Sequence, residues 1–230
     1  MGTLSSTLVR DKRILDAGVG TGRFAAPLQG LGFDIVGIDI SSRMLAKAQE
    51  KGVKNLFQAD ICALPFRDRR FTQTISIHVL HLVKRWKCAL GEIGRVTTGR
   101  FVSVAFHKAG SEAEEIREFY DNACKELGFE VHHPGVHERE LPELLPPDSE
   151  REIAQFERPV DVQKLIEDYE TRVYSAQWPV PDEIHDQAIE AMKERFKGVD
   201  QVMGRERIVL LEWDIKRIRQ FSEGTEPYRT

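Results

Sequence analysis

The 230-residue sequence predicts an α/β fold, a doubly wound and mostly parallel sheet with a helical cover inserted in the C-terminal half. Two observations support this prediction. Short apolar runs, among them Ile14–Leu15 and Phe33–Ile40, have the length of strands buried in a parallel sheet. The segments between these runs have the period of helices, and strands that alternate with helices are typical of a doubly wound sheet. Ligands of such sheets bind at the carboxyl ends of the strands.

The first half contains five expected strands separated by helices. Apolar and β-branched runs predict strands at 14–15, 33–40, 55–58, 71–79 and 100–106. A short helix after Gly22 ends near Gly30, because glycine is common just beyond helix ends. Ser41 caps a helix that runs to about Lys51, and another helix is expected around 87–96.

Helical patterns prevail in the second half. Ser111 and Glu114 form a capping box that begins a helix, and Gly128 ends it. Residues 131–150 lack a period and are expected to form a long connection. The remaining expected elements are a strand at 153–160, amphipathic helices at 161–173 and 181–197, and a strand at 207–215. The expected domains are a core at 1–107, a helical insertion with a late strand at 108–204, and a final strand with a tail at 205–230.

The composition, with 41% apolar and 30% charged residues, is that of a globular protein. No apolar run approaches the roughly 20 residues that a membrane span requires, and no signal-peptide pattern stands at the N-terminus. Cys62, Cys88 and Cys124 are scattered, which indicates neither a disulfide framework nor a zinc site. We expect a cytoplasmic protein without membrane contact, and the sequence implies no oligomeric state.

The charge is unevenly distributed along the chain. Residues 1–107 hold 16 Lys and Arg against 8 Asp and Glu, whereas residues 108–230 hold 17 against 29. A basic half can indicate a nucleic-acid partner, or two halves of one chain that attract each other. We prefer the second interpretation, because the basic residues form no single run with interleaved aromatic residues.

The stretch from Asp16 to Gly22 contains three alternate glycines directly after the first strand. Such glycines let backbone N–H groups approach a ligand closely, and the following helix N-terminus favours an anionic group. A dinucleotide fingerprint needs a glycine or alanine three residues after its second glycine, where this chain has Arg23. The spacing therefore disfavours NAD-type ligands.

Three carboxylates stand at expected strand ends, namely Asp16, Asp39 and Asp60. Each by itself could be a turn former or a helix cap. In a doubly wound sheet these strand ends line one crevice, so we expect the three side chains to converge there.

The Asp-x-Gly-x-Gly-x-Gly pattern of residues 16–22 resembles motif I of the class I S-adenosylmethionine-dependent methyltransferases. Residues 36–44 and 58–66 resemble motifs II and III of this family, and the resemblance covers residues 12–106. It implies a Rossmann-like fold, S-adenosyl-L-methionine as methyl donor, S-adenosyl-L-homocysteine as product, and no metal. Two scaffold turns depart from the family pattern, at Phe71–Thr72 and Thr97–Arg100.

The resemblance also implies roles for individual residues. Asp39 would bind the ribose hydroxyls, Ile40 and Met44 would flank the adenine, and Asp60 would accept a hydrogen bond from the adenine amine. The Ile61 backbone N–H would reach a ring nitrogen. The full set of implied cofactor-binding residues is Asp16, Gly18, Gly20, Thr21, Gly22, Arg23, Asp39, Ile40, Met44, Asp60, Ile61 and Ser76.

A general base is needed in methyl transfer only when the acceptor must lose a proton. His81, just past the fourth strand, is the candidate catalytic residue, and a structural histidine is the alternative. His78 is expected to pack inside the strand. His132, His133 and His137 match no metal signature, so no metal site is expected.

Arg172, Tyr174 and Trp178 stand between two expected helices and resemble a segment of some small-molecule methyltransferases. They are the candidate substrate residues, and the alternative is a helix corner whose rings fill a core. The expected function is methyl transfer to a small-molecule acceptor, with a nucleic-acid partner disfavoured. An RNA methyltransferase and a non-catalytic S-adenosylmethionine-binding regulatory module are the alternatives.

Overall fold

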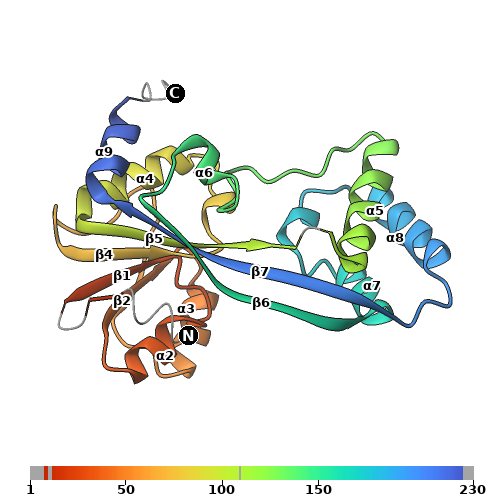
Figure 1. Ribbon diagram of the computed structural model, residues 1–230, viewed down its shortest axis with the longest axis horizontal. Coiled ribbons are helices and arrows are strands. Elements are labelled where there is room, and N and C mark those ends of the chain that lie inside the picture. Colours follow the sequence, from red (N-terminus) through yellow and green to blue (C-terminus); the bar gives the residue numbers. More distant parts are fainter. Residues whose placement is uncertain (1–7, 10–11, 109, 225–230) are drawn as a thin grey trace. The chain divides into compact units, whose positions relative to one another are not determined.

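The computed structural model describes residues 8–9, 12–108 and 110–224, and the outermost parts of the expected core and tail, 1–7 and 225–230, lie outside the described residues (Figure 1). The chain divides into two compact units. The first comprises residues 1–105, 135–153 and 209–230, and the second comprises residues 106–134 and 154–208. No helix of the described residues is long and apolar enough to cross a membrane.

A seven-stranded sheet has the strand order β3-β2-β1-β4-β5-β7-β6. Strands β1 to β5 pair in parallel and β7 runs antiparallel, which confirms the predicted α/β, mostly parallel fold. The strands are β1 Arg13–Ala17, β2 Asp34–Asp39, β3 Leu56–Gln58, β4 Phe71–Ser76, β5 Thr97–His107, β6 Ser149–Asp161 and β7 Gln201–Asp214.

Strand β1 lies between β2 and β4 in the sheet. Its Asp16 is in register with Gly37 of β2 on one side and Ile75 of β4 on the other. Ile14 and Leu15 are fully buried, as expected for a strand covered on both faces. Because these strands are parallel neighbours, the ends of β1, β2 and β4 share one edge of the sheet.

At the other side of the sheet, a buried carboxylate lies between two arginines. Glu212 of β7 pairs with Arg100 of β5 at 3.0 Å and with Arg151 of β6 at 3.8 Å. Glu212 is buried, and a carboxylate is rarely buried without such partners. These two ion pairs link β7 to both of its neighbours in the sheet, β5 and β6.

The helices of the first unit are α2 Ala25–Gly30, α3 Ser42–Glu50, α4 Trp86–Val96, α6 Leu141–Leu144 and α9 Ile215–Glu223, with a 3-10 turn at Leu80–Leu82. The Ser41 side chain accepts a hydrogen bond from the Met44 N–H, which confirms the predicted cap of α3.

Helix α9 lies within the stretch that the sequence analysis assigned to a C-terminal tail. The Asp214 side chain caps it by accepting from the Lys216 N–H, and its buried Ile218 packs toward α4. Arg219 donates to the carbonyl oxygen of Gly94 on α4 at 2.7 Å. The apolar positions are too few in nine residues to reveal a helical period without this neighbour.

The expected long connection also carries structure. Leu141 and Leu145 are buried in the core of the first unit, and Trp213 donates from its indole N–H to the Leu145 carbonyl oxygen at 2.9 Å. Residues 135–153 therefore belong to the first unit, although they fell within the expected insertion at 108–204. Isolated apolar residues among charges leave no periodic pattern, which is why the sequence did not reveal them.

The second unit contains the amphipathic helices that the sequence predicted. They are α5 Glu112–Glu126, α7 Val162–Glu170 and α8 Asp182–Arg195, with a 3-10 turn at Ser175–Gln177 between the last two. Their buried faces form one apolar cluster that includes Ile116, Ile166 and Met192. Inside it the Tyr120 hydroxyl lies 2.7 Å from Nδ1 of His185, so this buried polar pair is satisfied.

Candidate functional site

The glycine-rich turn after β1 has left-handed backbone at all three alternate glycines, with φ values of 91° at Gly18, 53° at Gly20 and 73° at Gly22. A Cβ on Gly18 would collide with the Val79 side chain, and one on Gly22 would lie 2.7 Å from Val53. At Gly20 no atom of the described residues lies within 4 Å of that position. The turn is thus packed at its ends and open at its middle, where a ligand can approach the backbone.

Asp39, at the end of β2, holds this turn. Its Oδ2 accepts from the Gly20 N–H at 2.9 Å, and its Oδ1 accepts from the Ser41 N–H at 2.8 Å. A carboxylate can accept about four hydrogen bonds, so capacity for a ligand diol is left. The contact joins the ends of two neighbouring strands through the predicted residue.

Asp16, at the end of β1, is almost fully buried, with 4% of its surface exposed. Burial, and secondarily the negative charge of Asp39, raise the pKa of the Asp16 carboxyl to about 7. A cationic group bound near both carboxylates would favour the ionised form. The arrangement suits a ligand with an ammonium group.

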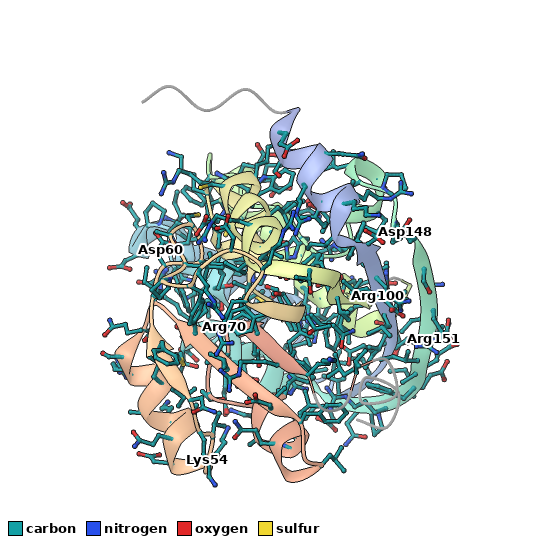
Figure 2. The ribbon with its side chains drawn as sticks, turned by 90° about the vertical axis from the view of Figure 1, so that its left-hand side faces the viewer. Lys54, Asp60, Arg70, Arg100, Asp148 and Arg151 are labelled. Atoms are coloured by element: carbon teal, nitrogen blue, oxygen red, sulfur yellow. The ribbon has the colours of Figure 1, made fainter. Side chains whose placement is uncertain are left out.

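The predicted adenine-flanking side chains are exposed to an unusual degree. Ile40 is 69% exposed and Met44 is 38% exposed, which leaves two large apolar groups facing outward just after β2. Asp60 accepts from the Cys62 N–H at 2.8 Å and has an exposed side chain (Figure 2). Ile61 is buried beside it. A flat ligand ring would remove the apolar pair from water.

The remaining predicted cofactor residues have different surroundings. Thr21 accepts from the Lys51 ammonium at 3.1 Å, and the exposed Arg23 guanidinium lies 5.5 Å from the Phe24 ring centre. Ser76 ends β4 fully buried, and its Oγ has no hydrogen-bond partner among the described residues. A buried hydroxyl without a partner is costly, and a ligand group could satisfy it. The open glycine, the carboxylates and this hydroxyl fit a polar ligand that carries an amine, a diol and an aromatic ring.

His81 lies just after β4 beside Glu138, a residue that the sequence analysis did not identify. Its Nδ1 is 3.5 Å from Glu138 Oε2, and both side chains are buried. Burial by itself would raise the pKa of the Glu138 carboxyl, but the His81 ring and the Val79 N–H together hold this pKa below its usual value. Glu138 comes from the stretch without periodicity, and no sequence signal pairs it with the end of β4.

The prediction that His78 packs inside the fourth strand was wrong. Strand β4 ends at Ser76, and His78 is exposed with a left-handed φ of 60°. The apolar residues of 71–79 continue beyond the last ladder pair, so composition overstated the length of the strand.

The predicted substrate residues lie in the loop between α7 and α8. The Arg172 guanidinium donates to the carbonyl oxygens of Gln177 at 2.6 Å and Val180 at 2.8 Å, and it pairs with Asp182 at 2.8 Å. Arg172 therefore closes its own loop, which favours the alternative of a helix corner for this residue. Trp178 is 62% exposed and donates from its indole N–H to the Arg172 carbonyl oxygen.

Tyr174 lies within the same unit, with its ring 5.0 Å from that of Tyr169. Of the three candidate residues, Trp178 alone presents a large exposed side chain. The assignment of a substrate role to these residues stays a prediction.

Comparisons with known proteins show what this chain is similar to. The profile of a family described as "Methyltransferase domain" matches residues 15–101. The chain is 31% identical over 157 residues to YodH, an uncharacterized methyltransferase of Bacillus subtilis, covering 62% of this chain and 67% of YodH. It is 36% identical over 101 residues to a demethylmenaquinone methyltransferase of Renibacterium salmoninarum, covering 43% of each chain.

Among solved structures, the YcgJ protein of Bacillus subtilis has the same fold. The TM-score is 0.57 at 20% identity, and the match covers 93% of this chain and 96% of YcgJ. The chain spans two thirds of YodH and less than half of the demethylmenaquinone methyltransferase.

Proposed function

Because this chain belongs to the class I S-adenosylmethionine-dependent methyltransferases, we propose that it transfers the donor's methyl group to a small-molecule acceptor. The hydrogen bond from the Gly20 N–H to Asp39 is the main support for cofactor binding. It places the unobstructed backbone at Gly20 next to a carboxylate that can accept hydrogen bonds from a ribose diol. The relative that acts on demethylmenaquinone supports a small acceptor.

S-adenosylmethionine supplies an activated methyl group on a sulfonium that is a good leaving group. The protein's own contribution is then to bind, to orient and to exclude water. Asp39 would hold the ribose hydroxyls, Asp16 would favour the amino group, and Ile40 with Met44 would cover the adenine faces. The Asp60 carboxylate, which already accepts from Cys62 N–H, has capacity for the adenine amine.

The acceptor side of this site is assigned to the residues after β4. Val79 packs against Gly18 of the cofactor turn, and His81 follows two residues later. For an acceptor that must lose a proton, His81 is the candidate base, and Glu138 would orient its ring. An acceptor that is already nucleophilic would need no base.

Calorimetry tests the proposal most directly. S-adenosylmethionine and S-adenosylhomocysteine are expected to bind one per chain, whereas NAD, used as the control, is not. A preference for NAD, or the absence of binding by both sulfur ligands, would show the cofactor assignment to be wrong. A screen of small acceptors, scored by S-adenosylhomocysteine release with tRNA as a parallel substrate, then separates a small-molecule enzyme from an RNA methyltransferase. Cofactor binding with no methyl transfer to any acceptor would favour the regulatory module.

A further inference from the structure

Two histidines and a glutamate from distant parts of the sequence meet just beyond β4. His78, His81 and Glu138 each offer one ligand atom, and these atoms all lie within 4.8 Å of one another. All three residues belong to the first unit. We propose that they bind a divalent transition-metal ion such as Zn²⁺ on the acceptor side of the site.

The distance between His81 and Glu138 is the first argument. Nδ1 and Oε2 are 3.5 Å apart, which is longer than the usual 2.7–3.2 Å of an N–H···O hydrogen bond. Two ligands bonded to a tetrahedral zinc at about 2.0–2.1 Å are separated by roughly 3.4 Å. The separation thus matches that of two neighbouring ligands of one ion, as well as that of a His–Glu ion pair.

The orientation of the carboxylate is the second argument. Glu138 Oε1 accepts from the Val79 N–H at 2.9 Å and from the Leu80 N–H at 3.4 Å, and this leaves Oε2 directed at His81. Backbone donors of this kind are the outer contacts that orient metal-binding carboxylates. Glu138 is only 3% exposed, and a buried carboxylate is stabilised by a cation beside it.

The two chain segments are also locked together. Gly135 donates its N–H to the His81 carbonyl oxygen at 2.9 Å, and Val136 donates to that of Leu80 at 3.3 Å. A Cβ on Gly135 would collide with the Leu80 carbonyl oxygen, so only glycine permits this approach. The contact holds Glu138 at a constant position relative to the residues after β4.

The imidazole rings are held as well. The His81 ring stacks on His137 with 4.9 Å between ring centres and 10° between planes. His78 has the left-handed φ of 60°, which is uncommon for residues other than glycine but is adopted by histidine more often than by most. Its ring centre is 6.1 Å from that of His81, and its exposure gives an ion access from solvent.

The ligand set indicates the kind of ion. Two imidazoles and one carboxylate suit zinc, cobalt and iron, whereas magnesium and calcium prefer oxygen ligands alone. Three protein ligands leave at least one coordination position for water or for an oxygen of the acceptor.

On the proposed function, such an ion would select an acceptor that carries a hydroxyl group. Coordination lowers the pKa of the hydroxyl, and its proton then leaves to water while the oxygen stays bound to the ion. His81 would in that case be a ligand in place of a base.

The test uses the untagged 230-residue chain, stripped of metal with a chelator and titrated with cobalt(II) chloride and with zinc chloride. We expect one ion per chain, seen as visible cobalt absorption and as calorimetric heat with zinc. Glu138→Gln and His78→Asn should each weaken the affinity at least about tenfold. Asparagine tolerates a left-handed φ, so His78→Asn keeps the fold even where Glu138→Gln does not.

His132→Asn is the matched control, because His132 is an exposed histidine outside the cluster. Its affinity for both ions should equal that of the wild type. Absence of binding by the wild type, or equal binding by His78→Asn and the wild type, would overturn the proposal. S-adenosylhomocysteine calorimetry on the same samples separates the two proposals. If the wild type binds metal but not S-adenosylhomocysteine, the proposed function is contradicted and the metal site is retained.

Discussion

The Gly20 N–H donates a 2.9 Å hydrogen bond to Asp39 Oδ2, which ties the glycine-rich turn after β1 to the end of β2. One carboxylate thus shapes the turn and is also the proposed acceptor for the ribose hydroxyls. Because both roles depend on the same side chain, replacing it should affect both cofactor binding and the stability of the turn, so both are measured.

Asp39→Ala should weaken S-adenosylhomocysteine binding by about 1–3 kcal/mol, through the loss of hydrogen bonds to a charged acceptor. Asp39→Asn keeps the shape and one acceptor oxygen, so its loss should be smaller. The control is Asp34→Ala, at the opposite end of β2, where an exposed carboxylate pairs with Arg13 at 2.7 Å. Calorimetry that shows equal losses for Asp39→Ala and Asp34→Ala would contradict the ribose assignment.

Because the pKa of Asp16 is raised, we expect the free energy of unfolding of the ligand-free protein to depend on pH. Its pKa is about 7 in the folded protein against an ordinary value of 3.8, so the folded state binds the proton more tightly between these values. The free energy of unfolding should therefore fall as the pH rises from about 4 to 7, by an amount on the order of 4 kcal/mol. Denaturant unfolding at several pH values measures the slope. Asp16→Asn should flatten it, and an unchanged slope in that variant would show that another group is responsible.

Alanine variants of Gly20 and Gly18 distinguish an effect on ligand binding from an effect on packing. Gly20→Ala has open space for its methyl group, so its folding cost is only the left-handed backbone, roughly 1–2 kcal/mol. Its methyl group should nevertheless obstruct the cofactor and lower S-adenosylhomocysteine affinity markedly. Gly18→Ala also has a positive φ, of 91°, and its methyl group would in addition collide with the Val79 side chain, so it should destabilise the fold more. Unimpaired cofactor binding by Gly20→Ala would show that the ligand does not approach there.

Trp178 and Arg172 test the loop between α7 and α8. Trp178→Ala should change the free energy of unfolding by no more than about 1 kcal/mol, because the side chain is exposed and makes one hydrogen bond. Turnover of an acceptor found by the screen should fall severalfold, with S-adenosylhomocysteine affinity unchanged.

Arg172→Ala is the comparison, and it should lower stability by about 1–3 kcal/mol, since the carbonyl oxygens of Gln177 and Val180 lose their donor. Thermal unfolding of both variants measures the difference. Unfolding of the Trp178 variant, with cofactor and acceptor properties lost together, would show that its ring is part of the core.

The sequence by itself determined the parts of the site that are local in the chain. Alternate glycines and the aspartate before them specify a strand, a tight turn and a helix start within a dozen residues. The Ser41 cap and the apolar faces of α5, α7 and α8 were likewise readable, because their contacts recur at fixed short spacing. The resemblance of residues 36–44 to motif II implied that Ile40 and Met44 flank a ligand, and the structure adds that both side chains are exposed.

Only the tertiary structure decided which distant residues meet. Glu138 reaches His81 because Gly135 allows a close backbone approach, and nothing in the local pattern of residues 131–150 indicates that contact. The sequence similarly suggested Arg172 as a substrate-binding residue, whereas the structure shows its guanidinium donating to the carbonyl oxygens of Gln177 and Val180. Propensity and periodicity report only on neighbours a few residues apart. A pairing between distant segments depends on which buried polar groups must find hydrogen-bond partners, and the packing of the whole chain determines which groups are buried.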